Sequence, residues 1–322
     1  MSQSKPHRGF FSIVFKVIML LAVIVVGGYF IQQQLLPDID PALIKPVEIL
    51  DSAGDSSPES ELANLPAGAI TRMISQSAID DAEHPFDPLL ELAAASIKKI
   101  DANIFDYKAT MVSQVFADGK LQPEKYLLCK IRHQRTVDDN ETPFSVYTLF
   151  LKPKANAGQE AIWVKGWNEG KLVAHANGLK NLIRVYLPPD GSIAMKGNRY
   201  PIRQIGIRNL LVKMSEIGKH DREYGECTVT LKRNVEINGC QCSVLEAKHP
   251  VKRDHFDFHI ARIYIDDERN IPIAYEGFSW PEKAGDEPPL LEKYYYTDIE
   301  FNVGLKNIDF DPANEEYNYP RW

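Results

Sequence analysis

Cysteines are scarce in this chain, and basic residues do not exceed acidic ones. The 322 residues hold four cysteines at irregular spacing, which argues against a dense disulfide framework and favours mostly buried free thiols. Acidic residues outnumber basic ones by 44 to 37, a formal net charge of −7. Without a basic stripe, this balance argues against nucleic acid as a partner. The four cysteines are Cys129, Cys227, Cys240 and Cys242.

The common catalytic and cofactor motifs are also absent. The sequence contains no G-x-S-x-G, H-E-x-x-H, G-x-x-x-x-G-K-[ST], G-x-G-x-x-G or C-x-x-C. Catalytic groups scattered along the chain would escape such a search. We nevertheless expect that the protein is not an enzyme and that it needs no cofactor.

Histidines gather after one pair of cysteines without forming a recognised site. His249, His255 and His259 follow Cys240 and Cys242. Their spacing fits no zinc finger or zinc ribbon, and a solvated strand face explains it as well as a metal site does. We therefore predict no metal ligands in this region.

An acidic cluster, Asp266-Asp267-Glu268, interrupts the stretch ARIYIDDERNIPIAYEGF. Apolar runs with a period of two flank it on both sides, as in paired strands. Asp and Asn stabilise turns by bonding to their own backbone, and Pro272 favours extended geometry in the residue before it. We interpret residues 266–270 as a hairpin loop rather than as a catalytic or metal-binding cluster.

Residues 9–31 form a long apolar run, GFFSIVFKVIMLLAVIVVGGYFI. Its length reaches the roughly 20 residues that span a bilayer, and Lys16 lies near one end, where it can snorkel. Lys5 and Arg8 precede the run, so the positive-inside rule places the N-terminus in the cytoplasm. The sequence thus predicts a single-pass inner (cytoplasmic) membrane protein whose C-terminal domain lies in the periplasm. A cleaved signal peptide is the alternative.

Composition divides the chain into three parts. Residues 1–31 are predicted to be a cytoplasmic tip and transmembrane anchor. Residues 32–85 are rich in Pro, Ser, Asp and Glu and are predicted to be a flexible tether. Residues 86–322 are predicted to be the exported domain.

Two main helices are predicted in the exported domain. DPLLELAAASIKKIDA, at 87–102, has Asp87 as a cap and Pro88 at the first helical position. PIRQIGIRNLLVKMSEIGK, at 201–219, is opened by Pro201 and ended by Gly218. Each segment carries its apolar residues on one stripe.

The rest of the domain reads as about ten or eleven strands. Short turns join most of them, Asn238-Gly239 being the strongest hairpin signal, so we expect an antiparallel sheet. The strands are apolar on both faces, and both faces therefore need cover. We predict an α+β fold in which a strongly curved antiparallel sheet, an incomplete β-barrel, wraps two main helices around a hydrophobic hollow.

Several stretches together resemble a known family. They are ETPFSVYTLFLKP, WVKGWNEGKLVAHANG, DGSIAMKGNRYPIRQIGIRNLL, IARIYIDDERNIPIAYEGFSWP and LLEKYYYTDIEFNVGLKNIDFDPANEEYNYP. From about Leu89 to Pro320, and in the same order along the chain, these stretches are similar to the bacterial "domain of unknown function 1571" family. That family has no established activity or catalytic residues to carry over. The order of elements also resembles, more distantly, the lipoprotein-carrier half-barrels of the LolA, LolB and RseB type. That resemblance implies a cavity for acyl chains. The predicted membrane anchor and tether distinguish this chain from those carriers, which are soluble.

We therefore expect a membrane-anchored envelope protein that holds lipid or lipoprotein acyl chains, or another apolar ligand, in its hollow. One alternative is an envelope structural, protein-interaction or sensor domain without lipid cargo, whose partner would be an envelope protein. A hydrolase is less favoured. The predicted ligand-binding residues are apolar or aromatic and lie on the early strands: Tyr107, Met111, Leu128, Tyr147, Leu149 and Trp163.

Overall fold

Strands make up most of this computed structural model, which describes residues 39–51, 75–178 and 181–321. They are β1 (Ile49–Asp51), β2 (Asp106–Ala117), β3 (Lys120–Leu121), β4 (Lys125–Arg132), β5 (Arg135–Val137), β6 (Asn140–Thr142), β7 (Ser145–Lys152), β8 (Glu160–Val164), β9 (Leu172–His175), β10 (Val185–Leu187), β11 (Thr228–Ile237), β12 (Cys240–Lys248), β13 (Ile260–Asp266), β14 (Ile271–Phe278) and β15 (Leu290–Phe301).

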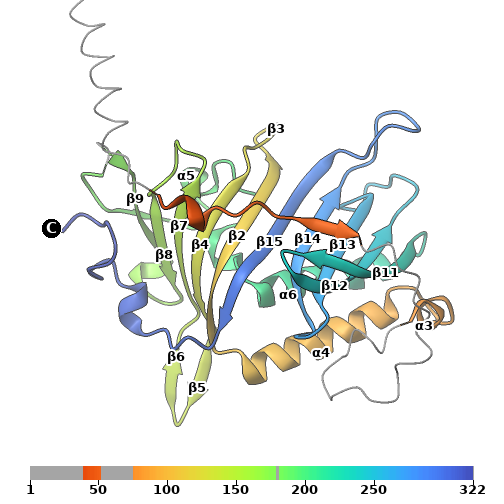
Figure 1. Cartoon of the computed structure of the whole chain (residues 1–322), viewed down its shortest axis with the longest axis horizontal. Helices are drawn as coiled ribbons and strands as arrows, with labels where there is room; N and C mark the ends of the chain where they lie inside the picture. Colours follow the sequence, from red (N-terminus) through yellow and green to blue (C-terminus); the bar gives the residue numbers. More distant parts are fainter. Residues whose placement is uncertain (1–38, 52–74, 179–180, 322) are drawn as a thin grey trace, which may run out of the picture.

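One curved antiparallel sheet contains thirteen of the described strands (Figure 1). Its order is β1-β11-β12-β13-β14-β15-β2-β4-β7-β8-β9-β10, with β3 paired to β2, while β5 and β6 form a separate two-stranded sheet. Because β1 and β10 stand at opposite ends of this order, the sheet is open and does not close into a barrel. The predicted large antiparallel sheet is thereby confirmed.

The number of strands predicted from the sequence was too low. Ten of the described strands have four or more residues, in line with the prediction, and the other five have two or three residues each. Segments this short carry too few alternations for a period of two to be recognised.

The two predicted main helices are confirmed as α4 (Asp87–Asn103) and α6 (Ile207–Arg222). Two single-turn helices, α3 (Gln76–Asp80) and α5 (Ser192–Met195), accompany them in the described part of the chain. Short 3-10 turns are η1 (Pro41–Leu43), η4 (Asn168–Gly170), η6 (Ile202–Gln204) and η7 (Asn307–Phe310). The helices α4 and α6 pack against each other on what we call the inner face of the sheet.

The bounds predicted for the second helix are wrong at both ends. Pro201 precedes a separate 3-10 turn, and the chain is redirected at Gly206, whose φ of 127° suits only glycine. Gly218 lies inside α6, where a Cβ would sit 3.3 Å from Leu90 Cδ2 on α4. This glycine therefore permits close helix–helix packing rather than ending the helix.

The start of α4 also differs from the prediction by one residue. Phe86 occupies the cap position and makes no side-chain cap bond, while Asp87 is already helical. The Asp87 carboxylate accepts a hydrogen bond from the backbone N–H of His84 and pairs with Arg222 at the end of α6. Asp87 thus links the two helices at one end.

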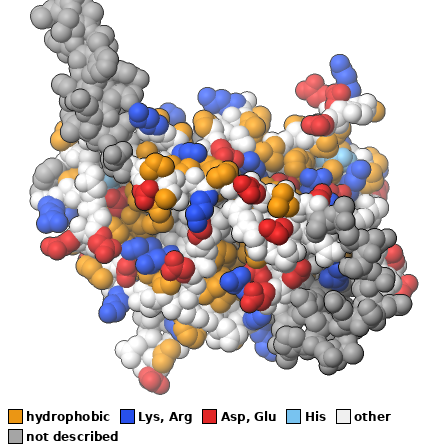
Figure 2. Space-filling model, in the orientation of Figure 1, with side chains coloured by type: hydrophobic (Ala, Val, Ile, Leu, Met, Phe, Trp, Pro, Cys, Tyr) orange, Lys and Arg blue, Asp and Glu red, His pale blue; other side chains and the backbone are white. Residues whose placement is uncertain are grey.

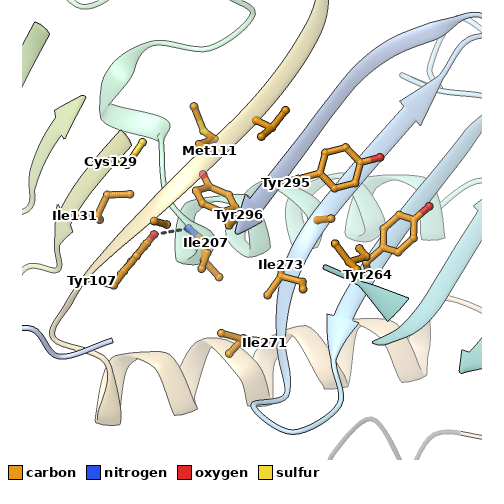
Figure 3. Packing of buried hydrophobic residues seen from close by; sticks show 14 of the residues in the cluster. Tyr107, Met111, Cys129, Ile131, Ile207, Tyr264, Ile271, Ile273, Tyr295 and Tyr296 are labelled. Atoms are coloured by element: carbon orange, nitrogen blue, oxygen red, sulfur yellow. Dashed lines mark hydrogen bonds between the residues drawn. The ribbon is translucent and has the colours of Figure 1, made fainter. Parts of the chain in front are cut away.

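Two tyrosines of the sheet hold the start of α6 (Figure 3). Tyr107 on β2 accepts a hydrogen bond from Ile207 N at 2.8 Å, and Tyr296 on β15 accepts one from Gly206 N at 3.0 Å. The first N–H groups of a helix have no partner within the helix. Gly206 has no side chain to cap α6, so these phenolic oxygens take that role.

Among the residues that the structure describes, the opposite, outer face of the sheet is covered by chain segments rather than by long helices. Figure 1 shows residues 39–51 crossing in front of the sheet, where β1 pairs with β11. The C-terminal segment covers β7 and β8, and Tyr317 stacks on Tyr147 with 4.2 Å between ring centroids. Residues 39–51 fall within the predicted tether, yet they contact the sheet; the domain boundaries 1–31, 32–85 and 86–322 stay a prediction.

Charged side chains of both signs are interspersed over this outer face (Figure 2). Some of them form ion pairs, as Lys45–Asp298 at 2.6 Å and Lys232–Asp51 at 2.7 Å illustrate. The visible surface therefore offers no extended basic stripe for a polyanion.

The prediction of a single-pass inner-membrane protein must be corrected. No helix in the described ranges is long and apolar enough to cross a membrane. The run predicted to be the anchor, residues 9–31, lies outside the described residues.

The acidic cluster does form a hairpin loop. Strand β13 ends at Asp266, β14 begins at Ile271, and the two strands pair directly. Asp266 Oδ1 accepts hydrogen bonds from the backbone N–H groups of Glu268 and Arg269, while Oδ2 pairs with Arg269 Nη1 at 2.7 Å. The turn also docks on α4, because Lys99 Nζ donates to Arg269 O.

Candidate functional site: a hollow under the curved sheet

The main cavity lies between the inner face of the sheet and residues 185–217. Its volume is about 1230 Å³. Strands β15, β2, β4, β7, β8 and β9 contribute to one wall, and β10, α5, η6 and α6 as far as Ile217 form the other. Apolar residues on the sheet wall include Met111, Leu127, Phe150, Ala161, Leu172 and Ala174. Those on the opposite wall include Val185, Leu187, Ile193, Ile202, Ile205 and Leu210.

The other half of the inner face is filled. There α4 and α6 pack on β12, β13 and β14, and the space left between them is only about 60 Å³. Leu92 and Leu245 are typical of the residues in contact, with 5% and 2% of their surfaces exposed. The helix α4 thus occupies one half of the curved sheet and leaves the β2–β10 half hollow.

Residues 196–200 form part of the rim, and two strand-end residues hold them in place. Lys125 on β4 donates to Gly197 O and Asn198 Oδ1, both at 2.6 Å, and Asp118 Oδ2 accepts from Gly197 N at 2.9 Å. Burial lowers the pKa of Lys125, and Asp118 nearby opposes that shift. The rim is therefore attached to the sheet by hydrogen bonds at a defined position.

A polar cluster interrupts the apolar wall. Glu292 on β15 is 5% exposed; its carboxylate lies 3.2 Å from Arg199 Nε and accepts hydrogen bonds from Tyr200 at 3.1 Å and Tyr294 at 3.3 Å. Burial raises the pKa of Glu292, while Arg199 and the two hydroxyls oppose the rise. Burial and the nearby Glu292 charge raise the pKa of Tyr200 to about 12, so its hydroxyl stays protonated and donates.

Three of the six predicted ligand-binding residues lie on the inner face. Met111 lines the hollow. Tyr107 is fully buried at the start of α6, and its hydroxyl is already engaged by Ile207 N. Trp163 points to the same side of β8 as Ala161 but donates its indole N–H to Gly170 O, and it does not reach the cavity lining.

The other three predicted residues lie on the outer face. Leu128, Tyr147 and Leu149 pack against the C-terminal segment rather than against the hollow. Tyr147 also donates its hydroxyl proton to Glu160 at 2.9 Å. The alternation in the sequence correctly predicted that Tyr147 and Leu149 share one face of their strand. It left open which side of the sheet that face is on. Ligand contact by the six residues stays a prediction.

Sequence reasoning missed the wall built from residues 185–205. This segment has one short strand and two short helical turns, and beyond Val185 and Leu187 on β10 its apolar residues follow neither a helical nor a strand period. The available signal was composition. The stretch is rich in Pro and Gly, as loops are, but it also contains large apolar residues that a solvent-exposed loop would not need, namely Val185, Leu187, Ile193, Ile202 and Ile205.

The histidines near Cys240 and Cys242 do not assemble a metal centre. No group of three or more His, Cys, Asp or Glu side chains in the described ranges is arranged to hold a metal ion. His249 is fully buried instead, with Nε2 at 3.0 Å from Asp221 Oδ2 and its ring stacked on Phe256. All four cysteines are free thiols, and burial raises the pKa of Cys129 to about 12.

Comparison with solved structures gives similar chains of low sequence identity, among them the following three. A DUF1329 family protein from Desulfovibrio piger has 12% identity and a TM-score of 0.34, with 71% of this chain and 98% of that chain covered. A putative outer membrane lipoprotein-sorting protein domain from Vibrio parahaemolyticus has 13% identity and a TM-score of 0.33, with 69% and 95% covered. A LolA superfamily protein from Nitrosomonas europaea has 12% identity and a TM-score of 0.26, with 68% and 97% covered. A lipoprotein-sorting domain and a LolA superfamily protein, the kinds of protein that the order of elements resembles, are thus among the similar chains.

Comparison of the sequence gives the family. No curated protein matches the chain. A family model described as "Protein of unknown function (DUF1571)" matches residues 104–319, which contain the sheet from β2 onward, α6 and the hollow. The chain therefore belongs to the DUF1571 family, as its sequence motifs predicted.

Proposed function

We propose that this protein is a binding module that holds lipid or lipoprotein acyl chains, or a similar apolar ligand, in the hollow under its sheet. The observation that carries the proposal is the cavity of about 1230 Å³ whose two walls are mainly apolar. Known ligand pockets measure about 300–1,000 Å³, so this one has room for a long chain.

Energetics support an apolar ligand. Burying one methylene contributes about 0.8 kcal/mol, so about 15 buried methylenes, roughly 12 kcal/mol, offset an association cost of about 4 kcal/mol and reach micromolar affinity. No catalytic group is required for such binding. Met111 on the sheet and Ile205 on the facing wall are among the residues that would contact the chain.

The first test is mass spectrometry of lipids extracted from the purified full-length protein. We expect a stoichiometric amphiphile to copurify, or a fluorescent fatty acid to bind once endogenous lipid is removed. A protein that neither retains nor binds any amphiphile would contradict the proposal.

The second test fills the hollow. Ala161 and Ala174 face each other across β8 and β9, and both line the cavity. Phenylalanine at both positions (Ala161→Phe with Ala174→Phe) should exclude several methylenes and weaken fatty-acid binding by about tenfold or more. Ala284→Phe, in an exposed loop, is the matched control and should bind as the wild type does. Equal affinity in the filled and control variants would place the ligand elsewhere.

A further inference from the structure

The carboxylate in the cavity wall is satisfied by the protein itself. Glu292 has three partners, namely Arg199, Tyr200 and Tyr294, and only 6% of its side chain is exposed. A buried carboxylate is costly unless it is paired and hydrogen-bonded, which these contacts achieve. Glu292 therefore has little capacity left for a ligand.

The guanidinium of Arg199 is in the opposite situation. It approaches Glu292 through Nε and also interacts with the Tyr200 hydroxyl, while 31% of the side chain remains exposed and lines the hollow. A guanidinium carries five N–H donors in a rigid fork, which suits two parallel hydrogen bonds to a carboxylate or phosphate. Glu292 and Tyr200 thus fix the position of Arg199, and the donors that these two residues do not use are available to a ligand within the cavity.

The other charged residues around the hollow also favour a negatively charged ligand. Six basic and four acidic residues line it, a surplus of two positive charges in a chain whose net charge is −7. Lys213 on α6 is close enough to Glu292 to lower the pKa of that carboxyl together with Arg199. The six basic residues are Lys120, Lys125, Lys196, Arg199, Arg203 and Lys213.

The polar cluster and the apolar wall are adjacent. Glu292 pairs with Val115 across β15 and β2, and Tyr296 on the same strand pairs with Met111. Val115 and Met111 both line the hollow. A ligand with its polar end at Arg199 would therefore lay its apolar chain directly along β2.

We infer that the ligand of the hollow is an anionic amphiphile whose carboxylate or phosphate oxygens accept hydrogen bonds from Arg199. This inference rests on the proposed function and adds to it the chemistry of the polar end. Glu292 acts as a positioning residue for Arg199 rather than as a ligand contact.

The test compares head groups on one alkyl chain, using the full-length wild-type protein. Palmitic acid, hexadecyl phosphate, methyl palmitate and hexadecyltrimethylammonium compete against a bound fluorescent fatty acid. We expect the acid and the phosphate to bind about tenfold more tightly than the neutral ester, since one charge-assisted contact is worth about that factor. Acetate and inorganic phosphate, which lack a chain, should not compete at the same concentrations.

The outcomes separate this inference from the proposed function. Equal binding of acid and ester, or tighter binding of the cation, would contradict the inference of an anionic head group. It would leave the proposal of an apolar binding site intact. Competition by inorganic phosphate alone would show that the ligand needs no alkyl chain and would contradict the inference that it is an amphiphile. Failure of every amphiphile to bind would overturn the proposed function itself.

Variants locate the head group. Arg199→Gln should abolish the preference for acid over ester, and Arg199→Lys should restore part of it. Arg262→Gln is the matched control, because Arg262 forms a similar ion pair with Glu246 at 2.7 Å on the outer face. This control should keep the full preference. An unchanged preference in Arg199→Gln would overturn the assignment, and the wild-type head-group series remains decisive if that variant fails to fold.

Discussion

At the scale of single residues, burial disfavours the charged form of His133. The side chain is 7% exposed at the end of β4, with Nδ1 2.9 Å from Ile104 O. Burial lowers its pKa from 6.5; Arg208 lowers it further, while the Ile104 carbonyl, Asp101 and Asp106 oppose the shift. Below pH 6.5 the unfolded chain therefore binds more protons than the folded protein does.

This difference predicts acid sensitivity. The free energy of unfolding should fall as the pH drops through 6.5 toward the lower pKa of folded His133. His133→Gln keeps a donor for Ile104 O but cannot titrate, so it should lose less stability between pH 7.5 and pH 5 than the wild type. Urea denaturation at several pH values measures both slopes, and identical slopes would contradict the prediction.

Asp266 shows how one side chain organises a turn that looked like a site. It is 1% exposed, and its carboxylate satisfies two backbone N–H groups of the hairpin and pairs with Arg269. The sequence predicted the turn correctly because Asp and Asn act through their own local backbone. It did not reveal that this turn docks on α4, since that contact joins residues 170 apart, Lys99 and Arg269.

Replacement of Asp266 should affect stability and not ligand binding. Asp266→Ala leaves two partly buried backbone N–H groups without their acceptor and removes the ion pair with Arg269, so we expect a loss of about 1–3 kcal/mol in the free energy of unfolding. Glu268→Ala, at an exposed position of the same loop, should stay within about 0.5 kcal/mol of the wild type. Loss of fatty-acid binding in folded Asp266→Ala would point to a functional role for the cluster instead.

At the scale of elements, the position of α6 depends on strands distant in sequence. Periodicity predicted an apolar stripe, and that stripe packs on α4 and the sheet. The ends of α6 were mispredicted because Pro201 and Gly218 have other roles in the tertiary structure. Gly206 redirects the chain where its Cβ would lie 3.2 Å from the Tyr107 hydroxyl.

The hydroxyl of Tyr107 should therefore stabilise the start of α6. Tyr107→Phe leaves Ile207 N–H buried without its acceptor, and we expect a loss of about 1–3 kcal/mol in the free energy of unfolding. Tyr186→Phe, at a tyrosine with 49% of its surface exposed, should be nearly neutral. Chemical denaturation compares the two, and a neutral Tyr107→Phe would contradict the capping role.

At the scale of the whole molecule, one curved sheet serves two purposes. On β12–β14 its inner face packs on α4 and α6 with about 60 Å³ left over, whereas the β2–β9 half faces a hollow of about 1230 Å³. The filled half supplies a conventional core. Most of the wall that faces the β2–β9 half of the sheet is irregular chain, and α6 forms only part of it, so space remains there for a ligand.

The sequence by itself determined the antiparallel sheet, its two main helices, the 266–270 turn and the family. All four rest on signals confined to a few neighbouring residues: alternation, the helical stripe, turn chemistry and contiguous motifs. Only the tertiary structure decided which face of each strand is inside, because strands such as β7 are apolar on both faces. It alone brought Tyr200 to Glu292, 92 residues away, since such a contact depends on how the sheet curves rather than on any local pattern.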